Sequence, residues 1–262
     1  MLKWCAFCQQ FQGEIPPYED LGITHSVCRD CQPKALEFDD SHIAHAQLLR
    51  TFHERLFAAG LHGDLASAER IIEDAMLFKI RGVDLLLGIM APIMHQVGEA
   101  WRCDTLSVTQ ERSFSELCRR IYDLVAAKMR MSLSDGSPEA ERPEALLFNA
   151  PANRHRLGLR IIALWLEQKG LRARIVEPTP GLDELVELVS STRPKLVLIS
   201  IAVAEQAVGV IAIAARITEL PAAVRPSVLV GGYAVKSGMI SSIPHAELLA
   251  DINLLAVANP AA

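Results

Sequence analysis

Two kinds of hydrophobic pattern follow one another along the chain. Residues 41–131 place apolar side chains every three or four positions, as amphipathic helices do, whereas short apolar runs alternate with helical stretches in residues 144–262. Residues 132–143 (SLSDGSPEAERP) follow neither pattern and are rich in Ser, Pro and charge, which predicts a linker. Residues 1–40 differ again and contain most of the cysteines. The chain is therefore expected to consist of a small N-terminal element, two domains and a linker.

The helical repeat predicts an up-and-down four-helix bundle, because its stretches have short connections. Asp64 is expected to cap the second helix, since its carboxylate can accept hydrogen bonds from the first free N–H groups. The four expected helices are Ile43–Ala59, Leu65–Phe78, Val83–Trp101 and Ser107–Met131.

Strands and helices alternate after residue 144, which predicts a doubly wound, flavodoxin-like parallel sheet. The run Lys195–Val203 is almost entirely apolar, as a strand buried on both faces requires. After Val235 the pattern defines a further helix only weakly. The other expected strands are Glu144–Phe148, Leu171–Val176 and Ser227–Val230, and the expected helices are Leu159–Gln168, Leu182–Val189 and Ala207–Leu220.

His155 follows the first of these strands and precedes its helix, so it is expected at the carboxyl edge of the sheet, where such folds bind ligands. Imidazole is a common metal ligand, and Gly158 would let a bulky ligand approach the backbone. A loop histidine that is solvated or caps the helix is the alternative. Nothing in the chain resembles a self-contained catalytic constellation.

Three motifs in order resemble the cobalamin-binding domain of corrinoid proteins. They are residues 153–158 (NRHRLG), Ser200 with the two residues that follow it, and the pair Gly231-Gly232. The resemblance implies that His155 is the lower cobalt ligand and that the cofactor's tail lies between the Ser and Gly-Gly loops. It implies adenosylcobalamin or hydroxocobalamin as cofactor.

Two residues depart from that family's pattern. Asn153 stands where the family usually has a carboxylate, which orients the imidazole and raises its basicity. An amide adds no negative charge, so cobalt ligation by His155 is expected to be weaker. Ala202 replaces a larger residue near the tail, which predicts a roomier pocket.

The segment around Trp101 resembles the helical cap of corrinoid methyl carriers and of CarH-type light sensors. Those sensors carry Trp, nine residues and Glu-His, and here Trp101 is followed at that spacing by Glu111-Arg112. The resemblance implies that Trp101 and Glu111 cover the upper cobalamin face. Arg112 stands in place of the His that captures cobalt after photolysis, and a guanidinium cannot do so. His95 and Cys103 are the other candidates for that ligand.

The N-terminal cysteines form two Cys-x-x-Cys pairs, Cys5 with Cys8 and Cys28 with Cys31. Paired spacings of this kind predict a four-thiolate zinc ribbon, with disulfides as the alternative. His25 is a further possible ligand, whereas Cys118 is interpreted as a core residue.

The composition of the chain limits the classes of molecule that it is expected to bind. The net charge of −5 argues against a phosphate-binding surface and thus against direct DNA binding. The chain shows no signal peptide and no membrane span, so a cytoplasmic location is expected. Homodimer formation is left open.

The first hypothesis for function is a cobalamin-binding, light-responsive sensor, not an enzyme, that regulates transcription through a protein partner such as a transcription factor or kinase. It resembles the antirepressors of photosystem genes. The alternatives are a corrinoid methyl-carrier protein of a methyltransferase system and a haem-binding redox sensor on the same fold.

Overall fold

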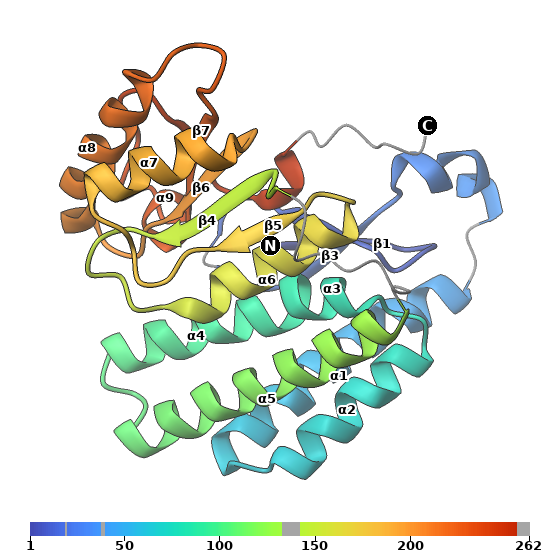
Figure 1. Ribbon diagram of the computed structural model, residues 1–262. Helices are drawn as coiled ribbons and strands as arrows, with labels where there is room; N and C mark the ends of the chain where they lie inside the picture. The colour runs from blue at the N-terminus through green and yellow to red at the C-terminus, as the bar shows by residue number, and fades with distance from the viewer. Residues whose placement is uncertain (19, 38–39, 133–141, 256–262) are drawn as a thin grey trace. The chain divides into compact units, whose positions relative to one another are not determined.

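The computed structural model describes residues 1–18, 20–37, 40–132 and 142–255 (Figure 1). It divides into two compact units, Met1–Ser134 and Asp135–Ala262. Most of the expected linker, residues 133–141, lies outside the described residues. Within the described part of the chain, no helix is long and apolar enough to cross a membrane.

The first unit begins with a three-stranded sheet in the order β2-β1-β3. Strand β1 (Leu2–Cys5) is antiparallel to β2 (Phe11–Glu14) and parallel to β3 (Ile23–Ser26), and the 3-10 helix η1 (Arg29–Glu37) follows. Because β1 and β3 run in the same direction, the two cysteine pairs leave the sheet at the same edge. These strands were not expected from the sequence, since runs of four residues are too short to show a period.

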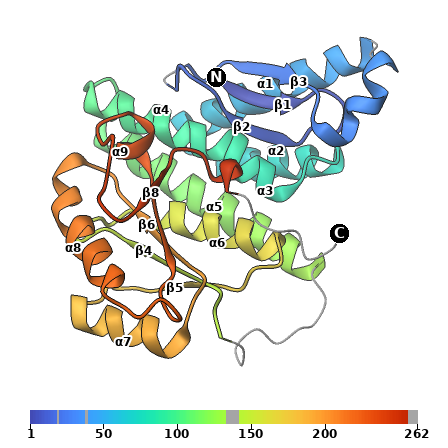
Figure 2. The same cartoon turned by 90° about the horizontal axis from the view of Figure 1, so that it is seen from above.

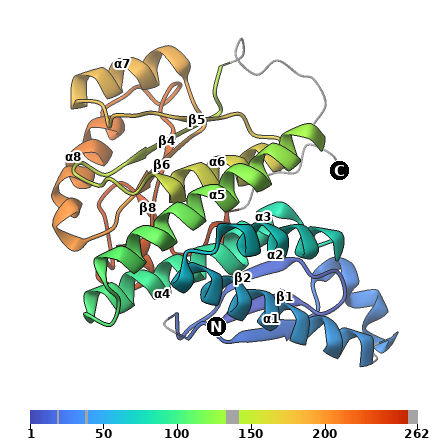
Figure 3. The same cartoon turned by 90° about the horizontal axis from the view of Figure 1, so that it is seen from below.

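Helices α1 (Asp40–His62), α2 (Leu65–Leu77) and α5 (Val108–Ser132) form most of the remaining unit and pack on one another (Figure 3). The predicted cap is confirmed: the Asp64 carboxylate accepts a hydrogen bond from the N–H of Ser67 at 3.0 Å. Figure 2 shows the three-stranded sheet beside α1 and α3 of the same unit.

The expected continuous helix Val83–Trp101 is wrong in detail. The structure has a short α3 (Gly82–Leu85), a π-helical turn η2 (Leu86–Met90) and α4 (Ala91–Arg102). Pro92 lies just inside α4 and has no N–H with which to reach the carbonyl four residues earlier, that of Gly88. A π-helical turn at this point keeps the chain helical around the missing hydrogen bond.

The second unit is a parallel sheet in the order β5-β4-β6-β7-β8, which confirms the expected α/β domain. Helix α6 lies on one side of the sheet and α7 on the other (Figure 3). The buried strand residues fill the space between sheet and helices. Its elements are β4 (Ala145–Asn149), α6 (Arg156–Gln168), β5 (Ala173–Ile175), α7 (Leu182–Thr192), β6 (Leu196–Ser200), η4 (Ala204–Gln206), α8 (Ala207–Thr218), β7 (Ser227–Gly231), α9 (Tyr233–Lys236), β8 (Glu247–Leu249) and η5 (Ile252–Leu254).

Candidate functional site

The four N-terminal cysteines converge on one point. Their sulfur atoms all lie within 4.8 Å of one another, and the Sγ atoms of Cys8 and Cys28 are 3.7 Å apart. With Zn–S bonds of about 2.3 Å, a tetrahedral site has sulfur–sulfur edges of roughly 3.8 Å. All four cysteines are free thiols, so the disulfide alternative is not supported. The cluster therefore has the geometry of a four-thiolate metal site.

Backbone groups favour a thiolate at Cys5, whereas burial raises the pKa of Cys31 to about 11 and that of Cys8 well above its ordinary value. The Cys28 N–H donates to the Sγ of Cys5 at 3.4 Å. Burial raises the pKa of Cys5, but hydrogen bonds from the backbone of Cys8, Cys28 and Phe7 outweigh it and bring the pKa to about 7. Such N–H donors also offset the negative charge of a metal bound by four thiolates.

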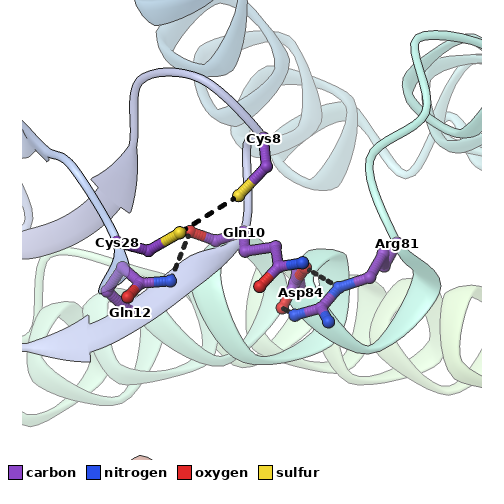
Figure 4. Close-up of polar contacts among 6 residues, drawn as sticks. All are labelled: Cys8, Gln10, Gln12, Cys28, Arg81 and Asp84. Carbon is purple, nitrogen blue, oxygen red and sulfur yellow. Dashed lines mark hydrogen bonds and ion pairs between the residues drawn. The ribbon is translucent and has the colours of Figure 1, made fainter. Parts of the chain in front are cut away.

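A partly buried ion pair lies beside the cluster (Figure 4). Arg81 donates to both carboxylate oxygens of Asp84, at 2.6 and 2.8 Å, and Asp84 is only 2% exposed. Burial alone would lower the pKa of Arg81, but Asp84 and the charges of Cys8 and Cys28 raise it above its ordinary value. The guanidinium thus supplies positive charge next to the cysteine cluster, which would favour thiolates there.

The three-stranded sheet of β1, β2 and β3 packs against the π-helical turn η2. A Cβ atom built on Gly88 would lie 2.3 Å from the ring of Trp4 and 2.7 Å from that of Phe11. Trp4 is completely buried, and it directly precedes Cys5 in β1. The cysteine cluster is therefore connected through two aromatic rings to the helix that leads to Trp101. No local pattern in the sequence predicts this contact, because its partners lie far apart in the chain.

A second group of candidate residues lies along the carboxyl edge of the parallel sheet. The strand register places Asn149, Ser200 and Gly231 side by side at the ends of β4, β6 and β7. Gly232 follows with a φ of +109°, and a Cβ there would lie 2.5 Å from the carbonyl oxygen of Ile201. Close approach of the two strand ends therefore requires glycine at this position. Asn149 was not singled out from the sequence, although a polar residue that ends a buried strand is a recognisable signal.

His155 is exposed and begins α6, but its side chain makes no capping hydrogen bond. Its imidazole is thus not used as a helix cap. Gly158 lies one turn later, and the space beyond its Cα is open, with no atom within 4 Å of a built Cβ. An accessible imidazole beside open space fits the requirements of a ligand to a large cofactor.

Asn153 holds the His155 loop to the neighbouring strand. Its side-chain oxygen accepts a hydrogen bond from the His155 N–H at 3.0 Å, and its amide nitrogen donates to the Ser200 carbonyl at 3.0 Å. The side chain is buried. A carboxylate could accept the first bond but could not donate the second. Asn153 therefore orients the backbone of the loop through one donor and one acceptor.

The substitution Asn153→Asp is expected to destabilise the second unit by about 1–3 kcal/mol, because it sets a buried carboxylate against the Ser200 carbonyl oxygen. Asn153→Ala removes both hydrogen bonds without this repulsion and should cost less. Urea unfolding, with hydrogen exchange of the β4 and β6 amides, measures the difference. Equal stability of the Asp variant and the unsubstituted protein would contradict the role assigned to the amide donor.

The cap residues expected over the cofactor lie at the ends of α4 and α5. Trp101 is 54% exposed, although it is one of the largest apolar side chains in the chain. Glu111, in the first turn of α5, accepts a hydrogen bond from the Ser115 hydroxyl at 2.8 Å. Arg112 is exposed and lines a shallow pocket of about 350 Å³ together with Gly63 of the α1–α2 connection. Trp101 thus offers an apolar surface that the first unit itself does not cover.

Comparison with known proteins places a cobalamin-related segment in the helical unit. Residues 53–125 match the family model described as "B12 binding domain". A protein of Rhodobacter capsulatus, "uncharacterized 20.5 kDa protein in bchF-crtJ intergenic region", is 31% identical over 107 residues, which cover 41% of this chain and 54% of that protein.

The HTH-type transcriptional repressor CarH of Myxococcus xanthus is 26% identical over 193 residues, covering 69% of this chain and 60% of the repressor. This chain thus spans little more than half the length of the curated relatives it matches. The fold is similar to that of the monomethylamine corrinoid protein of Methanosarcina barkeri, with a TM-score of 0.61 and 15% identity over 76% of this chain and 92% of that one.

Together the matches support cobalamin binding.

Proposed function

We propose that this chain is a cobalamin-binding sensor that regulates transcription through a protein partner. The observation that carries the proposal is the exposed imidazole of His155 beside open space at Gly158, at the sheet edge that also holds Ser200 and Gly231. The similarity to a transcriptional repressor supports the regulatory part. Bound cobalamin would supply a cobalt ion with an exchangeable upper ligand.

In this proposal the candidate cobalamin-binding residues have different roles. His155 would bind the cobalt, and Asn153 keeps the loop of His155 attached to the end of β6. Ser200 and the pair Gly231-Gly232 would contact the cofactor's tail. Trp101 and Glu111 would contact the exchangeable ligand, whose loss in light would be the signal. Because Arg112 is permanently protonated, it cannot replace the lost ligand on cobalt.

The test is the absorption spectrum of the protein with hydroxocobalamin and its His155→Ala variant. The unsubstituted protein should show the spectrum of imidazole-bound cobalt, and the variant should lose it, with affinity lower by roughly tenfold, or about 1.4 kcal/mol. His62→Ala, which removes another exposed imidazole at the end of α1, is the matched control and should change neither property. An unchanged spectrum in His155→Ala would refute the assignment.

A corrinoid methyl carrier is the second candidate, since the fold is similar to that of a monomethylamine corrinoid protein. A sensor and a methyl carrier are expected to respond differently to light. A sensor loaded with adenosylcobalamin should change its partner binding or its oligomeric state after green light, whereas a carrier should not. The same absorption spectra would reveal haem, the third alternative, by its Soret band.

We also propose that Cys5, Cys8, Cys28 and Cys31 hold one zinc ion. The sulfur separations support a tetrahedral site, and zinc is the metal that such sites usually bind in proteins. The ion would join the end of β1 to the segment that follows β3. Its task is then to stabilise the small sheet that packs on Gly88.

A further inference from the structure

A cavity of about 980 Å³ opens at the carboxyl edge of the parallel sheet, within the second unit. Its walls come from the end of β4, the loop before α6, the segment between β5 and α7, and the first half of α8. Of the residues proposed to bind cobalamin, only Asn153 lines it, and His155, Gly158, Ser200 and the glycine pair do not. The cavity therefore adjoins the proposed cobalamin site and shares Asn153 with it, and its volume suits a ligand of nucleotide size.

The deep wall of this cavity contains an unused hydrogen-bonding group. Asn149 is only 5% exposed, and its side-chain oxygen has no hydrogen-bond partner. Thr179 donates its hydroxyl to the Asn149 main-chain carbonyl at 2.8 Å and so holds the cavity wall to the end of β4. A buried polar atom without a partner is costly. This oxygen has almost no accessible surface of its own, so an N–H or O–H donor on a ligand would reach it, and remove that cost, after a rotation of the Asn149 side chain.

The rim of the cavity is positively charged. Arg154 and Arg156 both line it, and both are exposed. Arg156 lies 3.5 Å from the carboxylate of Glu177, which also lines the cavity. Guanidinium groups bind phosphate oxygens in a bidentate manner. Between rim and deep wall, Val176 and Ile213 contribute apolar surface.

We propose that this cavity binds an adenine nucleotide, with the base against Asn149 and the apolar wall and the phosphate on Arg154 and Arg156. The side-chain amide of Asn can pair with the N6 and N7 atoms of adenine, so the unused oxygen of Asn149 would accept from the exocyclic amine. A nucleoside phosphate combines this donor, a flat apolar face and a terminal anion in one molecule of suitable size. The site adds a second ligand to a chain proposed to bind cobalamin.

Calorimetric titration of the full chain with AMP is the first measurement. AMP should bind, and adenosine and inorganic phosphate should each bind at least about tenfold more weakly, because each lacks one half of the contacts. Absence of AMP binding at concentrations up to about 1 mM would overturn the proposal. So would equal affinity for AMP and adenosine, since the arginines would then contribute nothing.

Two variants on α8 test the location. Ala212→Trp would fill the cavity and should abolish AMP binding. Val208→Trp introduces the same side chain at a position that is 76% exposed and outside the cavity, and it should bind AMP normally. Retained AMP binding in Ala212→Trp, or its loss in Val208→Trp, would overturn the location. Both variants should bind hydroxocobalamin normally, which separates this proposal from the cobalamin site.

Two further substitutions test the chemistry of the contacts. Glu177→Gln removes the carboxylate that competes for Arg156 and should tighten AMP binding severalfold. Asn149→Leu keeps the approximate shape of the side chain and should weaken AMP roughly tenfold without changing the affinity for ribose 5-phosphate. Unchanged or weaker AMP binding in the Gln variant, or unchanged AMP binding in the Leu variant, would contradict the assigned contacts.

Discussion

Removal of the metal proposed at the cysteine cluster is expected to unfold residues 1–37 and to loosen the helices of the first unit, while the sheet of β4–β8 keeps its structure. A sheet of three short strands has too little core to fold by itself. Apparent binding free energies of structural zinc reach about 10–16 kcal/mol in small domains, so the metal would supply most of the stability of this element.

The effect should reach beyond the cysteines, because Trp4 and Phe11 cover Gly88 in the π-helical turn. When the sheet unfolds, this turn loses its cover, and the amides of Leu86–Met90 should exchange faster. Hydrogen exchange before and after chelation measures the spread of the change. The amides of β4 and β6 serve as the internal reference, and faster exchange there would contradict the independence of the second unit.

Two single substitutions provide the matched comparison. Cys28→Ser removes a buried thiol of the cluster and should lower both the zinc content and the thermal unfolding temperature. Cys103→Ser removes an exposed thiol at the end of α4 and should change neither. Absence of zinc from freshly purified protein, or an unfolding curve for Cys28→Ser that coincides with that of the unsubstituted chain, would refute the zinc proposal.

The substitution Trp101→Ala is expected to weaken adenosylcobalamin binding by about 3 kcal/mol, roughly a hundredfold, if the indole becomes buried against the upper ligand. Hydroxocobalamin lacks a large upper group, so its affinity should fall much less in this variant. The indole is 54% exposed without ligand, so the free energy of unfolding should change by no more than about 0.5 kcal/mol. Spectrophotometric titration with both cobalamins, next to urea unfolding, checks the three expectations.

Phe78→Ala is the control for this prediction. Phe78 is an aromatic residue of the same unit with a similar exposure of 52%, it follows α2, and its ring lies against that of Phe52. Its loss should leave the affinities for both cobalamins unchanged. If Trp101→Ala lost the same affinity for adenosylcobalamin as for hydroxocobalamin, the indole would contact something other than the upper ligand.

Local patterns in the sequence predicted several features correctly. The alternation of strands and helices after residue 144 predicted the parallel sheet, because a strand buried on both faces needs an apolar run such as that of β6. The Asp64 cap was recognisable for the same reason, since it depends on residues within one turn of the helix. Strand β8 was missed, because its three residues are exposed or only partly buried and are too few to show a period.

The sequence by itself determined the identity and spacing of the chemical groups: two cysteine pairs, one histidine between a strand and a helix, and one tryptophan at the end of a helix. These signals are local, since each depends on residues a few positions apart. Only the tertiary structure decided how distant segments meet. Trp4 and Phe11 lie on Gly88, Asn153 donates to Ser200, and Asn149 shares a cavity with α8. Contacts of this kind depend on how strands pair and helices pack, which no short stretch of the chain specifies.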